Sequence, residues 1–261
     1  MARLPDWMDR LMGRAEAAAP LPRLTAAQRP ALIYAIGDVH GCLDQLQALE
    51  ARIVADAAGT AGDKWIVMLG DYVDRGPRSA QVLDHLIAPP PAGFSRISLR
   101  GNHDQAMLSA LEDPRALDSW IGWGIESTLG SYGLGPSQMA ELAAPGRAAT
   151  RQQLLQAHIP DEHVAFLRNL PVLLSVPGYI FVHAGLRPGV ATAQQRDRDL
   201  MWIRGEFLDA GYDFGATVVH GHTPVDAPEL TPHRIGIDTG CYASGILTAV
   251  RIDDRGVTVV G

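Results

Sequence analysis

One stretch of the chain joins an apolar strand to a polar loop: Ala31-Leu32-Ile33-Tyr34-Ala35-Ile36-Gly37-Asp38-Val39-His40-Gly41. Its first six residues form an apolar run, which is typical of a strand buried on both faces. Apolar residues then recur at helical spacing from Leu43 to Val54, so we expect a helix directly after the loop. A strand, a loop and a helix in this order favour an α/β fold.

The same order recurs twice, after apolar runs at residues 65–69 and 97–99. The first run ends at Gly70-Asp71 and the second at Arg100-Gly101-Asn102-His103-Asp104, and helical spacing follows both. Later apolar runs predict further strands, at residues 178–182, 217–219, 234–237, 246–250 and 257–260. We therefore expect a layered α/β core around a largely buried sheet.

Two segments depart from this pattern. Residues 1–29 combine one apolar helical face with a Pro- and Ala-rich stretch, and we interpret them as an N-terminal arm. Residues 113–175 contain two tryptophans, several glycines and two or three helical stretches, which predicts an inserted helical lobe, or cap. The lobe lies within one domain that spans residues 30–261.

Composition excludes several classes of protein. Of the 261 residues, 47% are apolar and 20% are charged, as in an ordinary globular domain. A net charge of −7 gives no general attraction to nucleic acid or anionic lipid. The chain has no apolar run of bilayer length and no apolar signal sequence at its start, so we expect a cytoplasmic protein without membrane or nucleic-acid partners. Its oligomeric state stays open.

Cys42 and Cys241 are too few for a disulfide framework and lack the spacing of a thiolate zinc site. We interpret them as free thiols that fill space, and a redox role stays open.

Polar side chains with metal-binding potential follow the predicted strands directly. They are Asp38, His40, Asp71, Asn102, His103, His183, His220 and His222. Loops at strand ends are where open α/β sheets bind ligands, so these groups can converge in space. Carboxylate, amide and imidazole donors suit Mn²⁺, Fe or Zn²⁺. The sequence therefore predicts a metal centre.

Five glycine-bounded blocks resemble the signature of the calcineurin-like metallophosphoesterases, in particular the PPP group of serine/threonine phosphoprotein phosphatases in its bacterial and phage branch. The blocks are Gly37-Asp38-Val39-His40-Gly41, Gly70-Asp71-Tyr72-Val73-Asp74-Arg75-Gly76, Leu99-Arg100-Gly101-Asn102-His103-Asp104, His183-Ala184-Gly185 and Gly221-His222-Thr223. The similarity runs from about residue 32 to about residue 250. It implies a four-layer αββα sandwich around two divalent metal ions, with Mn²⁺ the first choice.

The resemblance also implies a role for each matching residue. The implied metal ligands are Asp38 and His40 for the first ion, Asp71 as the bridge, and Asn102, His183 and His222 for the second ion. His103 matches the general acid and Asp74 the carboxylate that orients it. Arg75, Arg100 and Arg204 match phosphate-binding arginines. The implied reaction is in-line attack of a metal-bridging hydroxide on phosphorus. His220 more closely fits a hydrogen bond to the site than a ligand.

The resemblance leaves the substrate between two main possibilities. A serine/threonine protein phosphatase or broad phosphomonoesterase is the first choice, because Asp74 and Arg100 are usually lacking in symmetrical dinucleoside tetraphosphatases. Asp104 favours that alternative, hydrolysis of diadenosine tetraphosphate, because protein phosphatases often carry glutamate there. A non-catalytic scaffold is disfavoured since no ligand is missing, and a nuclease is disfavoured by the acidic charge.

Overall fold

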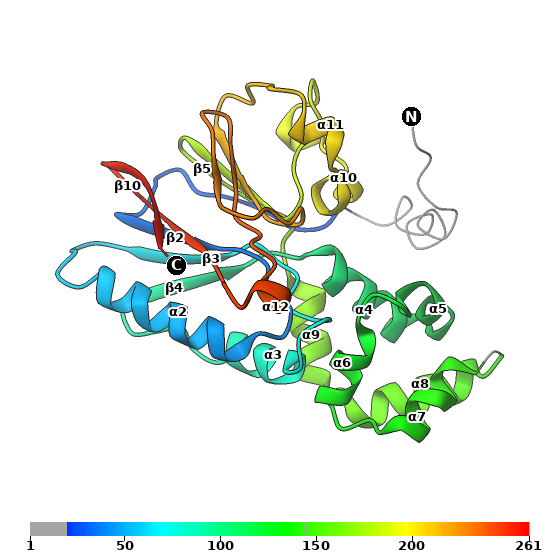
Figure 1. Cartoon of the computed structure of the whole chain (residues 1–261). Helices are drawn as coiled ribbons and strands as arrows, with labels where there is room; N and C mark the ends of the chain where they lie inside the picture. Colours follow the sequence, from blue (N-terminus) through cyan, green and yellow to red (C-terminus); the bar gives the residue numbers. More distant parts are fainter. Residues whose placement is uncertain (1–19, 145, 261) are drawn as a thin grey trace.

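A computed structural model describes residues 20–144 and 146–260, and in them two sheets pack face to face (Figure 1). The five-stranded sheet has the order β11-β10-β2-β3-β4. Its strands are β2 (Leu32–Ile36), β3 (Lys64–Met68), β4 (Phe94–Ser98), β10 (Ala249–Asp253) and β11 (Gly256–Val260). β2, β3 and β4 are parallel, and β10 lies antiparallel to β2.

The six-stranded sheet has the order β1-β5-β6-β7-β9-β8. Its strands are β1 (Arg23–Thr25), β5 (Leu173–Val176), β6 (Tyr179–Val182), β7 (Thr217–His220), β8 (Glu229–Leu230) and β9 (Arg234–Gly236). β6, β7 and β9 are parallel neighbours, so their carboxyl ends lie at one edge of the sheet.

The alternation of side chains along β2 explains why its apolar run is unbroken. Leu32, Tyr34 and Ile36 belong to the cluster that packs on the helices, whereas Ile33 and Ala35 belong to the cluster between the two sheets. Successive residues of a strand face opposite sides, so a strand in an inner layer needs apolar residues at every position.

Helices complete the four layers. α2 (Leu43–Asp56) and α3 (Ser79–Ile87) contribute buried residues to the cluster on the outer face of the five-stranded sheet. α10 (Asp197–Trp202) and α11 (Gly205–Leu208) contribute Leu200, Met201 and Phe207 to the cluster that includes β6 and β7 residues. The predicted αββα architecture is therefore confirmed.

The helical lobe lies beside the sandwich (Figure 1). It follows α4 (Asn102–Glu112) and consists of a short 3₁₀ helix, η2 (Pro114–Ala116), and of α5 (Leu117–Trp120), α6 (Ile125–Ser131), α7 (Pro136–Ala143), α8 (Ala148–His158) and α9 (Asp161–Asn169). β5 begins at Leu173, so the last residues of the segment 113–175 belong to the sheet.

The structure departs from the sequence pattern once in each sheet. In the six-stranded sheet, residues 23–25, within the segment interpreted as an arm, form β1, which pairs in parallel with β5. The helical face expected earlier in the arm lies outside the described residues. In the five-stranded sheet, β10 starts at Ala249 rather than at residue 246, and Ile246 is exposed. Short η3 (Thr192–Gln194) and α12 (Cys241–Ser244) complete the elements.

No described helix has the length and apolarity that crossing a bilayer demands.

Candidate metal centre

The predicted ligands lie in loops whose backbone is unusual. Among the described residues, the non-glycine positions with positive φ are His40, Asp71, Asp74, Arg75 and His222. All five belong to the predicted site. A left-handed conformation costs a non-glycine residue about 1 kcal/mol or more, and it persists only where the surrounding contacts enforce it. The loops are therefore held in one shape that aims these side chains.

Two glycines of the motif blocks let these loops approach one another. A Cβ atom at Gly101 would lie 2.1 Å from Asp71 Oδ1, and a Cβ atom at Gly221 would lie 2.0 Å from Asp38 Oδ1. Neither contact is possible for a real side chain. The glycines are thus required because the predicted ligand carboxylates occupy the space beside them.

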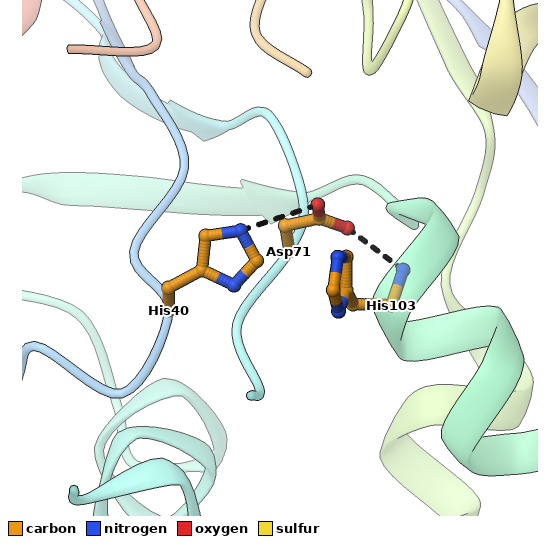
Figure 2. Close-up of side chains that lie close together, drawn as sticks. All are labelled: His40, Asp71 and His103. Atoms are coloured by element: carbon orange, nitrogen blue, oxygen red, sulfur yellow. Dashed lines mark hydrogen bonds and ion pairs between the residues drawn. The ribbon is translucent and has the colours of Figure 1, made fainter. Parts of the chain in front are cut away.

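Asp71 is shared by two groups of metal-binding side chains. The first group is His40, Asp71 and His103, the second is Asp71, His183 and His222, and within each group the ligand atoms lie within 4.8 Å of one another. Asp71 Oδ2 is 3.5 Å from His40 Nε2, as Figure 2 shows, and Asp71 Oδ1 is 3.4 Å from His183 Nε2. One carboxylate thus faces both groups, as the bridge of a two-metal centre must.

Hydrogen bonds fix which imidazole nitrogen faces the centre. His40 Nδ1 donates to the carbonyl of Val73 at 2.7 Å, and His183 Nδ1 donates to the carbonyl of Leu69 at 3.0 Å. In each neutral ring the lone pair is then on Nε2, which faces Asp71. His183 Nε2 also lies 2.8 Å from Asn102 Oδ1, so two acceptors face each other. A cation bound by both atoms removes this conflict, and such support of ligand histidines by carbonyls is typical of metal sites.

The pKa values separate three histidines from the fourth. Burial lowers the pKa of His40 to about 3 and also lowers the pKa of His183 and of His222. These three rings are therefore neutral, the form that binds metal. His222 Nε2 is buried and has no hydrogen-bond partner among the described residues. Burial acts against protonation of His103 as well, but Asp71 and Asp74 outweigh it and raise its pKa.

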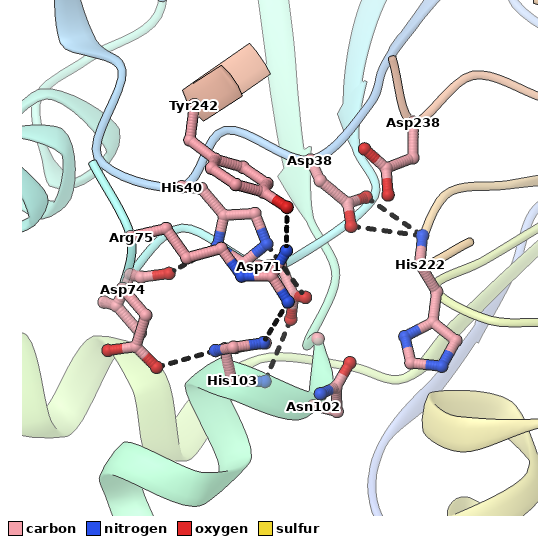
Figure 3. Close-up of polar contacts among 12 residues, drawn as sticks. Asp38, His40, Asp71, Asp74, Arg75, Asn102, His103, His222, Asp238 and Tyr242 are labelled. Carbon is pink, nitrogen blue, oxygen red and sulfur yellow. Dashed lines mark hydrogen bonds and ion pairs between the residues drawn. The ribbon is translucent and has the colours of Figure 1, made fainter. Parts of the chain in front are cut away.

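Three buried carboxylates crowd the same place (Figure 3). Burial and the neighbouring charges of Asp238 and Asp71 raise the pKa of Asp38, whose oxygens accept the His222 backbone N–H at 3.2 and 3.1 Å. Burial and Asp71 likewise raise the pKa of Asp238. Burial also opposes the charge of Asp71, but the surrounding histidines hold its pKa below its usual value. This concentration of anionic groups matches what divalent cations require.

Asp74 orients His103 through a short hydrogen bond. His103 Nδ1 lies 2.6 Å from Asp74 Oδ2, and both side chains are buried (Figure 3). The lobe holds the carboxylate from the other side: Trp120 Nε1 donates to Oδ2 at 2.6 Å and Thr128 Oγ1 donates to Oδ1 at 2.8 Å. His103 is thus fixed in position, and the carboxylate of Asp74 favours its protonated form.

Two of the three predicted phosphate-binding arginines lie at the centre. Arg75 Nη1 donates to the Tyr242 hydroxyl at 2.6 Å, and Arg75 Nη2 is 3.4 Å from His103 Nε2. Arg204 is exposed, and its backbone carbonyl accepts the N–H groups of Phe207 and Leu208 at 2.8 and 2.9 Å. Partial burial lowers the pKa of Arg204, and the carboxylates of Asp238, Asp38 and Asp71 oppose that shift.

The structure places Arg100 and His220 elsewhere. The buried Arg100 guanidinium donates to Gln105 and to the carbonyls of Leu167 and Arg168 at the end of α9, so it joins the lobe to the core. These partners bind Nη1 and Nη2, whereas the buried Nε has no hydrogen-bond partner among the described residues. His220 packs edge-on against Phe207 at 5.0 Å and belongs to neither ligand group.

Sequence reasoning missed several residues that support the centre. Asp104 accepts backbone N–H groups of Asp71, Tyr72 and Gly101 at 2.8–2.9 Å, and so ties the loop after β3 to the start of α4. Asp104 lies within a motif block, and this was the sign in the sequence that it supports the centre. Trp120, Thr128 and Tyr242 carry no comparable signal, because none of them lies in a block.

Two sheets pack face to face, and Asp71, at the end of a strand, lies between two groups of metal-binding side chains. This arrangement is that of a metal-dependent hydrolase. A family model described as calcineurin-like phosphoesterase matches residues 31–259, so the chain belongs to this family. The family resemblance of the five blocks is thereby confirmed.

Relatives within the family carry a more specific name. The chain is 33% identical over 295 residues to a symmetrical bis(5′-nucleosyl)-tetraphosphatase of Aromatoleum aromaticum, covering 86% of this chain and 95% of the relative. It is 27% identical over 243 residues to the asymmetrical bis(5′-nucleosyl)-tetraphosphatase PrpE of Oceanobacillus iheyensis, covering 84% and 88%. The crystal structure of a putative diadenosine tetraphosphatase superposes with a TM-score of 0.64 at 23% identity, covering 92% of this chain and 97% of the other.

These relatives overturn the prediction of a serine/threonine protein phosphatase or broad phosphomonoesterase. That choice was based on Asp74 and Arg100. In the structure the guanidinium of Arg100 packs between core and lobe, where it donates to the carbonyls of Leu167 and Arg168.

Proposed function

We propose that this protein hydrolyses dinucleoside tetraphosphates such as diadenosine tetraphosphate at a two-metal centre. The observation that carries the proposal is the 33% identity to a symmetrical bis(5′-nucleosyl)-tetraphosphatase across 95% of that relative. The centre described above supports it, because its cationic and metal-binding groups suit a highly anionic phosphate chain. We expect symmetrical cleavage, into two nucleoside diphosphates.

The residues present fit two divalent ions. Asp38, which lies near Asp71, and His40 would hold the first, Asn102, His183 and His222 the second, and Asp71 both. His103 also lies in the group of His40 and Asp71, but its hydrogen bond to Asp74 suits it to proton donation. The mixed oxygen and nitrogen donors suit Mn²⁺, which we propose as the metal, with Fe and Zn²⁺ as the other candidates. When bound, the ions would polarise the reacting phosphate and supply a nucleophile at neutral pH.

The protein's own side chains would divide the remaining work. Arg75 and Arg204 would bind phosphate oxygens and stabilise the charge that develops on them. His103, protonated and held by Asp74, would donate a proton to the oxygen that leaves phosphorus. A departing nucleoside diphosphate is a better leaving group than an alkoxide, so this proton matters less for a dinucleoside tetraphosphate than for an alkyl phosphate.

The test is a substrate and metal panel on chelator-treated protein. Mn²⁺, Zn²⁺ and Fe²⁺ are added back separately, and diadenosine tetraphosphate, p-nitrophenyl phosphate and a phosphoserine peptide are compared by kcat/KM. We expect diadenosine tetraphosphate to be the best substrate and ADP to be its sole product. ATP and AMP as products would show asymmetrical cleavage. A lack of turnover of diadenosine tetraphosphate with all three metals would contradict the proposal.

A further inference from the structure

A continuous chain of rings surrounds Asp71, with neighbouring centroids 4.7–6.2 Å apart. Its members in order are Tyr242, His40, His103, Trp123, Trp202, His222 and His183. The four histidines are buried. Trp123 and Trp202 are partly buried and Tyr242 is 41% exposed. The three rings that are not histidines, Tyr242, Trp123 and Trp202, therefore form an aromatic rim of the centre, which hydrolysis of phosphate itself does not require.

A cavity of about 450 Å³ adjoins this rim at Tyr242. It lies between the start of α2, the turn at residues 75–78, and α12 with its flanking residues. Its volume falls within the range of about 300–1,000 Å³ that is typical of small-molecule sites. A cavity of this size beside the centre can hold a part of the substrate that does not react.

Arg75 lies at the boundary between the cavity and the centre. Arg75 lines the cavity, its guanidinium lies over one face of the Tyr242 ring at 4.6 Å from the centroid, and it reaches His103 on the other side (Figure 3). A phosphate chain that runs from the centre past Arg75 therefore arrives at the part of the Tyr242 ring that Arg75 leaves exposed. Aromatic rings bind nucleobases by stacking, largely independently of base identity.

We propose that the cavity beside Tyr242 holds one nucleoside of the dinucleoside tetraphosphate, with its base against the Tyr242 ring. This inference rests on the proposed function, because only that substrate carries a nucleoside beyond its phosphate chain. It assigns the preference for a dinucleoside to a specific surface: the centre and Arg75 would bind phosphate in any substrate, whereas the cavity would bind only a substrate with a terminal nucleoside.

Two variants of Tyr242 separate the contribution of its ring from that of its hydroxyl. Tyr242→Phe keeps the ring but removes the hydroxyl that Arg75 contacts, and Tyr242→Ala removes both. The Mn²⁺-loaded proteins are compared by kcat/KM for diadenosine tetraphosphate and by the inhibition constant of inorganic tetraphosphate, which has no base. Relative to Tyr242→Phe, we expect Tyr242→Ala to lose about 5- to 150-fold in kcat/KM, the range of one stacking contact, with the same inhibition constant.

A third variant fills the cavity and leaves Tyr242 and Arg75 in place. Ala243 is exposed and lines the cavity, so Ala243→Trp should raise KM for diadenosine tetraphosphate more than it raises the inhibition constant of tetraphosphate. Equal kcat/KM in Tyr242→Ala and Tyr242→Phe, or an unchanged KM in Ala243→Trp, would overturn the inference. A wild-type protein that does not cleave diadenosine tetraphosphate would instead contradict the proposed function. Thermal melting checks that each variant is folded.

Discussion

The strand-end loops and the helical lobe contribute to one centre in different ways. The loops after β2, β3, β6 and β7, and the start of α4, carry the side chains of both ligand groups. The lobe carries no member of these groups, yet it donates two hydrogen bonds to Asp74. The loops thus carry the proposed metal ligands, and the lobe positions Asp74, the partner of the proposed proton donor His103. Variants in the two regions should therefore affect different properties.

The largest effect is expected at the carboxylate that both ligand groups share. Asp71→Asn removes the charge between the groups, so metal content should fall and kcat/KM for diadenosine tetraphosphate should drop at least about 1,000-fold. Metal analysis and steady-state kinetics measure the two quantities. The control is Asp254→Asn, which changes a 98% exposed side chain. An Asp71→Asn protein with two metals and full rate would remove the basis of the loop assignment.

His103 separates proton donation from metal binding within the core. His103→Asn should lower kcat for an alkyl phosphate by about 100-fold or more, with a smaller loss for diadenosine tetraphosphate. The metal content should not change, because His103 is hydrogen-bonded to Asp74 and the proposed ligands Asp38, His40 and Asp71 all remain. His233→Asn, which changes a side chain that is 44% exposed, serves as the control. Full activity on the alkyl phosphate would show that another group donates the proton.

A substitution at Thr128 tests the contribution of the lobe to the position of Asp74. Thr128→Val removes the hydroxyl that donates to Asp74 Oδ1, and a hydrogen bond to a charged group contributes about 1.5–3 kcal/mol. We expect kcat for the alkyl phosphate to fall about 10-fold while the metal content stays at the wild-type value. Thr128→Ser keeps the hydroxyl and should keep the rate. Loss of metal from the valine variant would mean that the lobe also supports the ligand loops.

The smallest effect concerns stability of the core away from the centre. Burial would raise the pKa of Glu50, but His85 at 2.7 Å and Arg96 at 2.9 Å outweigh it and hold the pKa below its usual value. A lowered folded-state pKa stabilises the protein above the unfolded-state pKa, and this contribution disappears as pH falls through the folded value.

Glu50→Gln should therefore lower the free energy of unfolding by about 1–3 kcal/mol at pH 7 and by less near pH 3.5. Urea unfolding at both pH values measures the difference. Glu112→Gln is the matched control, because the pair of Glu112 with Arg168 is exposed and should contribute less than about 1 kcal/mol. An equal loss at both pH values would assign the effect to packing rather than to charge.

The sequence allowed the core to be predicted because its signals are local. An apolar run followed by glycine and a ligand marks a buried strand end, and three such runs became β2, β3 and β4. β1 has three residues that lie in a Pro- and Ala-rich segment, and only pairing with β5, about 150 residues later, makes it a strand. No local pattern records such a partner.

The supporting residues and the substrate were harder to predict from the sequence, for a related reason. Trp120 and Thr128 reach Asp74 only because the folded chain places the lobe beside it. Arg100 shows the converse: it lies within a motif block, but its guanidinium bonds to α9. Motif membership predicts position along the chain, whereas the direction of a long side chain depends on tertiary contacts.

Both hydrogen bonds from the lobe to Asp74 come from its first two α-helices, α5 and α6. Farther out, α7 packs on α8, whereas α8 also packs on η2 and α4, and Arg151 of α8 pairs with Asp118 of α5 at 2.7 Å. An engineer who seeks new ligands can therefore vary the exposed residues of α7, whereas replacing α8 would also disturb the helix that carries Trp120.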